Sequence, residues 1–195
     1  MKKLLRFIVE TRAATLVEFS FIAPLLFVIT FGVAELGYFY FQYQALDAAT
    51  RMGARIAATR GPAITGMPDC GVAVATSPGN YCSATGAGTQ WSATCTGTAL
   101  TTSGGAVAVA CDAAIMGRIL QEMRLVYPSL AQNNIVVTFS GSKLGFVGKG
   151  RPVPLVTVEV AGVTASLPVL SAFGIGPFLM PSFSTSLPGE DLAGT

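Results

Sequence analysis

The sequence contains no histidine, and only 11% of its 195 residues are charged. Histidine is the side chain most often used as a general base near neutral pH, and it is the commonest metal ligand. Lysine and arginine do not gather into the patch or stripe that a nucleic-acid-binding surface needs. These absences argue against nucleic-acid binding, a metal centre and histidine-based catalysis.

Known catalytic motifs are lacking as well. Gly148-Lys149-Gly150 has neither the upstream glycine nor the following serine or threonine of a phosphate-binding loop. Glu190 and Asp191 are neighbouring acids without a partner base, and no serine has a recognisable nucleophile context. We therefore expect a protein that is not an enzyme, with no cofactor and no small-molecule substrate.

What the sequence does contain is a long apolar run near its N-terminus. The run extends from Ala13 to Ala34 with Glu18 as its only charge. About 20 apolar residues suffice to cross the hydrocarbon core of a bilayer, which is roughly 30 Å thick. On a helix Glu18 and Glu35 would lie about 26 Å apart, close to opposite faces of the membrane. The pattern predicts one transmembrane helix.

The residues before the run form a basic leader, residues 1–13. Its basic residues are Lys2, Lys3, Arg6 and Arg12. Three basic residues follow the run, namely Arg51, Arg55 and Arg60. This small excess before the run favours a cytoplasmic N-terminus.

A cleaved secretory signal is the main alternative to a retained anchor. The small residues of Gly32-Val33-Ala34 match the pattern that a signal peptidase reads, so cleavage after Ala34 would release a secreted protein. However, acidic residues precede and enter the apolar run, and residues 38–41 would leave an apolar mature N-terminus. We favour a retained helix.

An amphipathic extension is expected to follow the span and to complete one long helix over residues 14–60. Apolar residues recur at spacings of three and four, in the order Tyr38, Phe41, Ala45, Ala49, Met52 and Ile56. Asp47 and Arg51 form an i,i+4 pair of opposite charge. Arg60-Gly61-Pro62 is a typical helix end.

The four cysteines all follow the span. They are Cys70, Cys82, Cys95 and Cys111. An even number of cysteines beyond an export signal predicts disulfides outside the cytoplasm, and four cysteines allow three pairings. A zinc site is not expected, because no Cys-x-x-Cys pair is present. Residues 61–111 are rich in Gly, Ala and Thr with Asp69 as their only charge, so we expect loops ordered by the cysteines.

Residues 112–195 have the pattern of a small exported α+β unit. Asp112 is placed to cap a helix that ends near Tyr127, before Pro128. Strands are expected at Ile135–Ser140, Leu155–Val163 and around Phe178–Leu187. The predicted fold class is α+β: a long N-terminal helix, then a small helix and a short antiparallel sheet.

The segment Arg12-Ala13-Ala14-Thr15-Leu16-Val17-Glu18-Phe19 resembles the TadE-like minor pseudopilins of the tight-adherence (Flp-type) pilus system. The likeness continues to Arg60 through Glu35, Tyr43 and the Arg-Met-Gly-Ala-Arg segment at 51–55. A weaker likeness covers VPLVTVEVAGV and SFSTSLPGEDL near the C-terminus.

This resemblance implies that a prepilin peptidase cleaves between Ala13 and Ala14, which makes Glu18 the fifth residue of the mature chain, followed by Phe19. Ala13 stands where the family usually has glycine. The new α-amino group could then pair with the Glu18 carboxylate, in the same chain or in a neighbouring subunit.

The resemblance also implies the setting in which the protein works. It implies a non-enzymatic single-pass protein of the bacterial inner membrane, with its C-terminal domain in the periplasm. The implied partners are inner-membrane lipid, the prepilin peptidase, other pilin-like subunits and the Tad secretion machinery. The alternative is a signal-anchored extracytoplasmic binding domain unrelated to pili.

Overall fold

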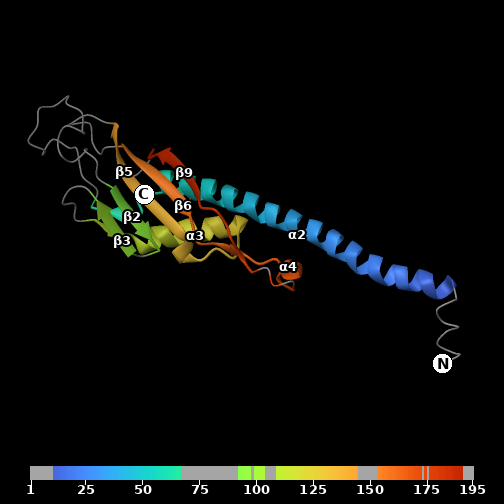
Figure 1. Cartoon of the computed structure of the whole chain (residues 1–195). Helices are drawn as coiled ribbons and strands as arrows, with labels where there is room; N and C mark the ends of the chain where they lie inside the picture. The colour runs from blue at the N-terminus through green and yellow to red at the C-terminus, as the bar shows by residue number, and fades with distance from the viewer. Residues whose placement is uncertain are drawn as a thin grey trace, which may run out of the picture. The chain divides into compact units, whose positions relative to one another are not determined.

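The computed structural model describes most of the chain as helices and antiparallel strands (Figure 1). The described residues are 11–66, 92–97, 99–103, 109–144, 153–172, 174 and 176–190. The helices are α2 (Thr11–Thr59), α3 (Ala113–Val126), the 3-10 turn η2 (Gln132–Asn134) and α4 (Pro168–Ala172). The α+β class predicted from the sequence is confirmed.

The described strands form three sheets, one with five strands and two with two strands each. The central sheet contains β2 (Ser92–Thr96), β3 (Ala99–Ser103), β5 (Ile135–Leu144), β6 (Val153–Val160) and β9 (Phe183–Pro188). The two small sheets pair β1 (Ile64–Thr65) with β4 (Ala110–Cys111), and β7 (Thr164–Ala165) with β8 (Phe178–Leu179).

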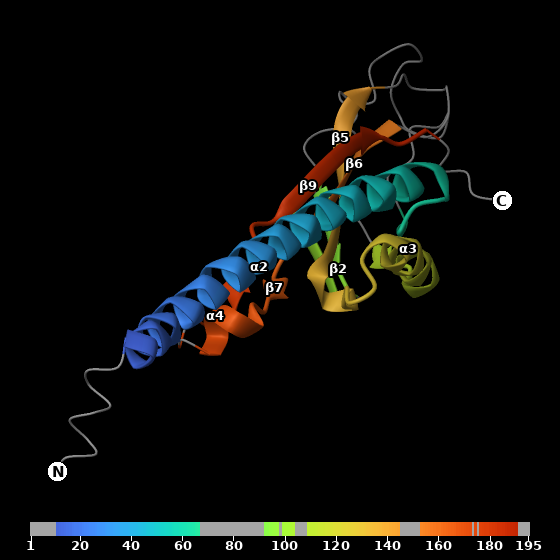
Figure 2. The same ribbon diagram turned by 90° about the vertical axis from the view of Figure 1, so that its right-hand side faces the viewer.

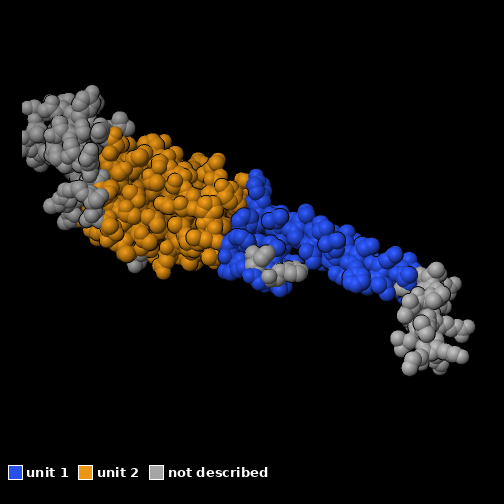
Figure 3. Space-filling model, in the orientation of Figure 1, with its two compact units in different colours: residues 1–41, 165–178 blue, residues 42–164, 179–195 orange. Residues whose placement is uncertain are grey.

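The chain divides into two compact units (Figure 3). Unit 1 comprises residues 1–41 and 165–178, and unit 2 comprises residues 42–164 and 179–195. The division passes through α2, so this helix contributes residues to both units. The predicted four-part division of the sequence (1–13, 14–60, 61–111 and 112–195) remains a prediction.

Helix α2 joins the predicted span and the predicted extension without interruption. It continues past Pro24 and ends at Thr59. Gly61 has a φ of 92°, a left-handed conformation that glycine adopts without steric cost, and Pro62 cannot continue a helix. The predicted helix end is confirmed.

The residues that α2 buries in unit 2 lie on a different face of the helix from most of the predicted apolar stripe. The buried residues are Leu46, Ala49, Thr50, Gly53, Ala54, Ala57 and Ala58. Ala49 belongs to both sets, but Tyr38, Phe41 and Met52 are exposed. Small residues face the core because they let the helix approach its neighbours closely, whereas the sequence stripe was weighted by bulky side chains.

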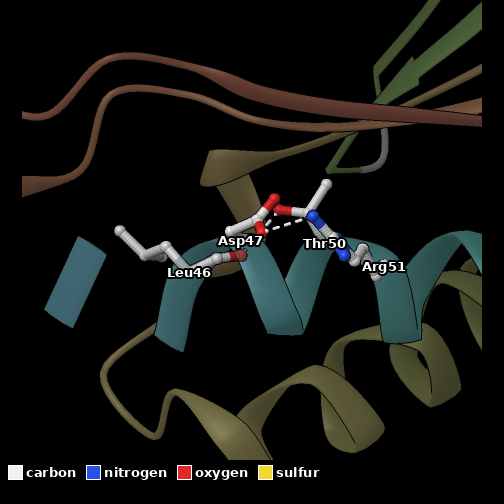
Figure 4. A network of polar contacts seen from close by, with 4 residues as sticks. All are labelled: Leu46, Asp47, Thr50 and Arg51. Carbon is white, nitrogen blue, oxygen red and sulfur yellow. Dashed lines mark hydrogen bonds and ion pairs between the residues drawn. The ribbon is translucent and has the colours of Figure 1, made fainter. Parts of the chain in front are cut away.

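Two polar side chains of α2 in unit 2 have their partners within the helix itself. The buried hydroxyl of Thr50 donates to the carbonyl oxygen of Leu46 at 2.8 Å, so it is buried with its hydrogen bond satisfied (Figure 4). Arg51 and Asp47 form the predicted i,i+4 ion pair on the outer side, with Nη2 and Oδ2 2.9 Å apart (Figure 4).

The central sheet has strand order β3-β2-β5-β6-β9, and every neighbouring pair is antiparallel. Alternation places one apolar row inward, because Val137 lies opposite Val158 and Phe139 opposite Val156, and all four are fully buried. The other face carries hydroxyls: Thr94 and Thr138 have oxygens 2.9 Å apart. The strand predicted at Ile135–Ser140 is confirmed, and the strand predicted at Leu155–Val163 is confirmed as far as Val160, where β6 ends.

Two predictions about the strands need correction. The sequence predicts loops over residues 61–111, yet β2 and β3 form an antiparallel pair and β2 pairs with β5. Their short pattern of small residues is weak in the sequence, and pairing with β5 decides the conformation. The strand expected around Phe178–Leu187 is divided into β8 and β9, and Pro181 lies between them.

Helix α3 begins as predicted. The Asp112 carboxylate accepts hydrogen bonds from the backbone N–H groups of Ala114 (2.8 Å) and Ile115 (3.2 Å), which caps the helix. Its buried residues are Met116, Ile119, Leu120 and Met123. Figure 2 shows α3 near the C-terminal half of α2. A Cβ on Gly53 of α2 would lie 2.6 Å from the Met123 sulfur, so these helices meet within unit 2.

One disulfide joins the described cysteines, Cys95 on β2 and Cys111 on β4. Their Cα atoms are 5.9 Å apart, and Cys95 is fully buried. The prediction that cysteines of this region form a disulfide is confirmed for this pair. Cys70 and Cys82 lie outside the described residues.

Candidate functional site

The residues of the predicted processing site lie in the first turns of α2. The bond between Ala13 and Ala14 is within the helix, which begins at Thr11. Ala14 and Glu18 are both exposed, and their i,i+4 spacing places them on the same face one turn apart. Phe19 is 68% exposed beside them.

Glu18 lies on an outward apolar surface. Its neighbours Leu16 and Phe21 are 71% and 75% exposed. Within the described ranges the only ion pair is that of Arg51 with Asp47, so Glu18 forms none there. A carboxylate in this setting is available to a cation from another chain or from a processed N-terminus.

The apolar surface around Glu18 continues along α2 to Phe41. Apart from Phe39, which is half-buried, the large apolar side chains in this part of the helix are 40% to 75% exposed, from Val28 at the lower end to Phe21 at the upper end. Among the described residues, one helix is long and apolar enough to cross a membrane, and it is α2. Such exposed apolar area is unfavourable in water and marks contact with lipid or with other apolar helices.

Glu35 has a second role that the sequence did not indicate. Its carboxylate accepts hydrogen bonds from the backbone N–H groups of Val169 and Leu170, the latter at 3.0 Å. These groups belong to the first turn of α4, whose N–H groups have no partner inside the helix. Pro168 at the first helical position was a visible sign of a helix start, but no local signal connects it with Glu35 across 134 residues.

An aromatic contact accompanies this interaction in unit 1. The rings of Phe39 and Phe178 are edge-on, with centroids 6.5 Å apart and an interplanar angle of 65°. Phe39 lies one helical turn after Glu35. Together, the two contacts hold residues 165–178 against one short stretch of α2.

Unit 2 carries a basic surface groove beside α2 and α3. The groove has a volume of about 450 Å³ and is lined in part by Arg55, Arg60 and Arg118, with Ile56 and Glu122. In the part of the chain that the structure describes, no group of three His, Cys, Asp or Glu side chains could hold a metal ion. Lys149 and Asp191 lie outside the described residues.

Comparison with known protein families identifies the N-terminal part of the chain. Residues 13–55 match the family of TadE-like proteins. The match begins at Ala13, includes Glu18 and Glu35, and ends at Arg55; the weaker C-terminal likeness lies outside it. No curated protein and no solved structure matches the chain. The similarity to TadE-like proteins thus covers the exposed apolar part of α2 and the start of its buried part.

Proposed function

We propose that the protein is a minor pseudopilin-like component of tight-adherence (Flp-type) pilus assembly, anchored in the bacterial inner membrane by α2. The observation that carries the proposal is the TadE-like match over residues 13–55, which includes the exposed apolar surface of the helix. In this proposal the N-terminus is cytoplasmic, residues beyond the span are periplasmic, and the role is structural rather than enzymatic.

The physical basis is the behaviour of an exposed apolar helix with one carboxylate. Residues 14–34 satisfy their backbone hydrogen bonds within the helix, as a lipid-exposed segment must, except at the carbonyl of Ser20, whose i+4 residue Pro24 has no N–H. Glu18 costs a few kcal/mol inside a bilayer unless it finds a partner. Pairing with the α-amino group of a processed neighbour offsets that cost, and it sets the register between packed helices.

Processing at Ala13–Ala14 is the step that creates this amino group. The prepilin peptidase is the proposed enzyme, and pilin-like subunits and the Tad secretion machinery are the proposed partners. Ala13 and Ala14 are both small, and Glu18 and Phe19 follow at the spacing of the family. Because the helix begins at Thr11, the bond must be opened locally before it is cut.

The mass of the mature protein, isolated from the membranes and from the secreted fraction of cells that contain a prepilin peptidase, tests the proposal. We expect a chain that begins at Ala14, and the uncut chain in a strain without that peptidase. A chain beginning at Met1 in both strains would support a plain signal anchor and contradict processing. A chain beginning at Glu35 would identify a secreted protein instead.

The structure bears on this last alternative. Cleavage after Ala34 would cut through the middle of α2 and make Glu35 the first residue. Glu35 bonds two amides of α4 from a position in a continuous helix, and a frayed terminus would hold this carboxylate less well. This favours a retained helix.

A further inference from the structure

A long stretch near the C-terminus has the composition of a membrane-contacting segment. No charged residue occurs between Glu159 and Glu190. The middle of this stretch, residues 165–178, belongs to unit 1 together with the N-terminal part of α2 (Figure 3). We call residues 165–178 the apolar strap. Figure 2 shows its helix, α4, beside α2.

The strap has an inner and an outer side. Ala165 and Leu167 are buried, with 2% and 4% of their surface exposed. Pro168 and Ala172 are exposed, and 42% of Phe178 is exposed. Ser166 and Ser171 are exposed as well, and the Ser171 hydroxyl donates to the carbonyl of Pro168. The described residues of the strap therefore present an uncharged outer surface of apolar side chains, glycines and two serines, in a unit whose other member is an exposed apolar helix.

The strap is attached to α2 at a defined level. Glu35 accepts hydrogen bonds from Val169 and Leu170, and Phe39 contacts Phe178. Glu35 and Phe39 are four residues apart, or about 6 Å along the helix axis. The strap is thus held at Val169–Leu170 and at its last residue, Phe178, within about one turn of α2.

That level corresponds to the outer boundary of the proposed membrane span. Glu18 and Glu35 are separated by about 26 Å along the helix. With Glu18 near the cytoplasmic face, Glu35 reaches the region where hydrocarbon meets headgroups. Tyr38 and Tyr40 are 58% and 64% exposed just beyond it, as in the aromatic belts of membrane proteins.

We propose that the apolar strap is a second membrane-contacting element, seated in the interfacial zone of the outer leaflet beside the span. The occupant of its outer surface is lipid. The proposal rests on the proposed membrane anchor, since the same leaflet covers both. The Glu35 contact supports lipid rather than water: it satisfies the first amides of α4 from within the chain, as a helix end near hydrocarbon requires.

Fluorescence quenching by brominated lipid tests this placement in the full-length protein. Trp91 is replaced by Phe, and single tryptophans are introduced as Phe178→Trp or Ala172→Trp. Each protein is reconstituted into phosphatidylcholine vesicles that carry bromine either near the headgroup end or near the methyl end of the acyl chain. We expect both strap tryptophans to lose fluorescence, more strongly with bromine near the headgroup end.

Tryptophans at two further positions distinguish a failure of the membrane anchor from a failure of the strap proposal. Phe27→Trp, 58% exposed in the middle of the span, is expected to be quenched most by bromine near the methyl end. Leu125→Trp, 74% exposed on α3 next to Arg124, is expected to keep its fluorescence in both lipids. Loss of quenching at position 27 would overturn the membrane anchor itself.

Quenching at position 27 without quenching at positions 172 and 178 would overturn the strap proposal alone. Tryptophans at positions 172 and 178 that are quenched only after the protein is diluted in lipid would show that the strap contacts a second copy of the chain. This too would contradict the proposal. Circular dichroism of each variant before reconstitution shows that the helices are retained, so an unquenched strap cannot be ascribed to unfolding.

Discussion

At the scale of single residues, Gly53 shows how α2 approaches α3. A Cβ at this position would lie 2.6 Å from the sulfur of Met123, and Met123 is fully buried. Sulfur and methyl groups are flexible, but a buried side chain has little space into which it can move. The absence of a side chain at Gly53 therefore sets the distance between the two helices.

Gly53→Val is expected to lower the free energy of unfolding by about 1–3 kcal/mol, the usual cost of overpacking a core. Gly117→Val on α3 is the matched control, because a Cβ there meets nothing within 4 Å. Chemical denaturation of both variants separates packing from helix propensity. Equal stability of the two variants would show that Met123 yields freely and would contradict this account.

At the scale of elements, Glu35 links α2 to α4 in unit 1. The carboxylate has two oxygens for two amides, whereas an amide side chain offers one acceptor oxygen and no charge. Hydrogen bonds to a charged group contribute about 1.5–3 kcal/mol, more than neutral ones. Removing the charge should therefore loosen α4 while leaving unit 2 intact.

Glu35→Gln is expected to speed hydrogen exchange at the amides of Val169 and Leu170. Amides of β5 and β6 should keep their original exchange rates, since none of their hydrogen bonds involves Glu35. Glu122→Gln, an exposed change on α3, serves as the control and should leave α4 protected. Unchanged exchange at Val169 and Leu170 in the Glu35 variant would show that α4 is held by packing alone.

Elements with a strong local pattern could be predicted from the sequence, and those that depend on distant partners could not. The apolar run, Asp112 and Gly61-Pro62 each contain their own signal, so α2 and the start of α3 were predicted correctly. The β2–β3 pair depends on the alignment of β2 with β5, whereas the local sequence pattern predicts a loop. The contact of Glu35 with α4 joins residues 134 positions apart, beyond any periodicity.

The same distinction applies to the face of α2. Periodicity identified a helix, but the apolar stripe that it indicated includes Tyr38 and Met52, which are exposed. The core of unit 2 selects the small residues Ala54, Ala57 and Ala58 because of the space available there. In the candidate site, Ala14, Glu18 and Phe19 could be named from the sequence, and their shared exposure became visible only in the structure.

At the scale of the whole molecule, Glu18→Val tests the proposed role in assembly. We expect the variant to remain in the membrane fraction, because valine makes the span more apolar, and we expect it to impair pilus biogenesis. Ser20→Val is the matched control: Ser20 is also exposed and polar, but its hydroxyl donates to the carbonyl of Val17 in its own helix.

Pilus counts by electron microscopy, together with the amount of protein in carbonate-washed membranes, give the two readouts. Normal pili with Glu18→Val would contradict the pairing of Glu18 with a neighbouring α-amino group. Loss of pili with both variants would point to general damage to the span instead. The expected result is loss with Glu18→Val alone.

The position of β9 has a consequence for the timing of folding. Phe183 on β9 packs edge-on against Tyr43 of α2, with ring centroids 4.6 Å apart, and the N–H of Glu190 donates to the carbonyl of Ala58 at 3.0 Å. Unit 2 is therefore closed by a strand that is synthesised after all the other strands that the structure describes. Until that strand arrives, one edge of β6 stays unpaired and the aromatic ring of Tyr43 lacks its cover. Pairing of β9 with β6 is a contact between distant parts of the sequence, so the sheet of unit 2 stays incomplete on the nascent chain until β9 has been synthesised.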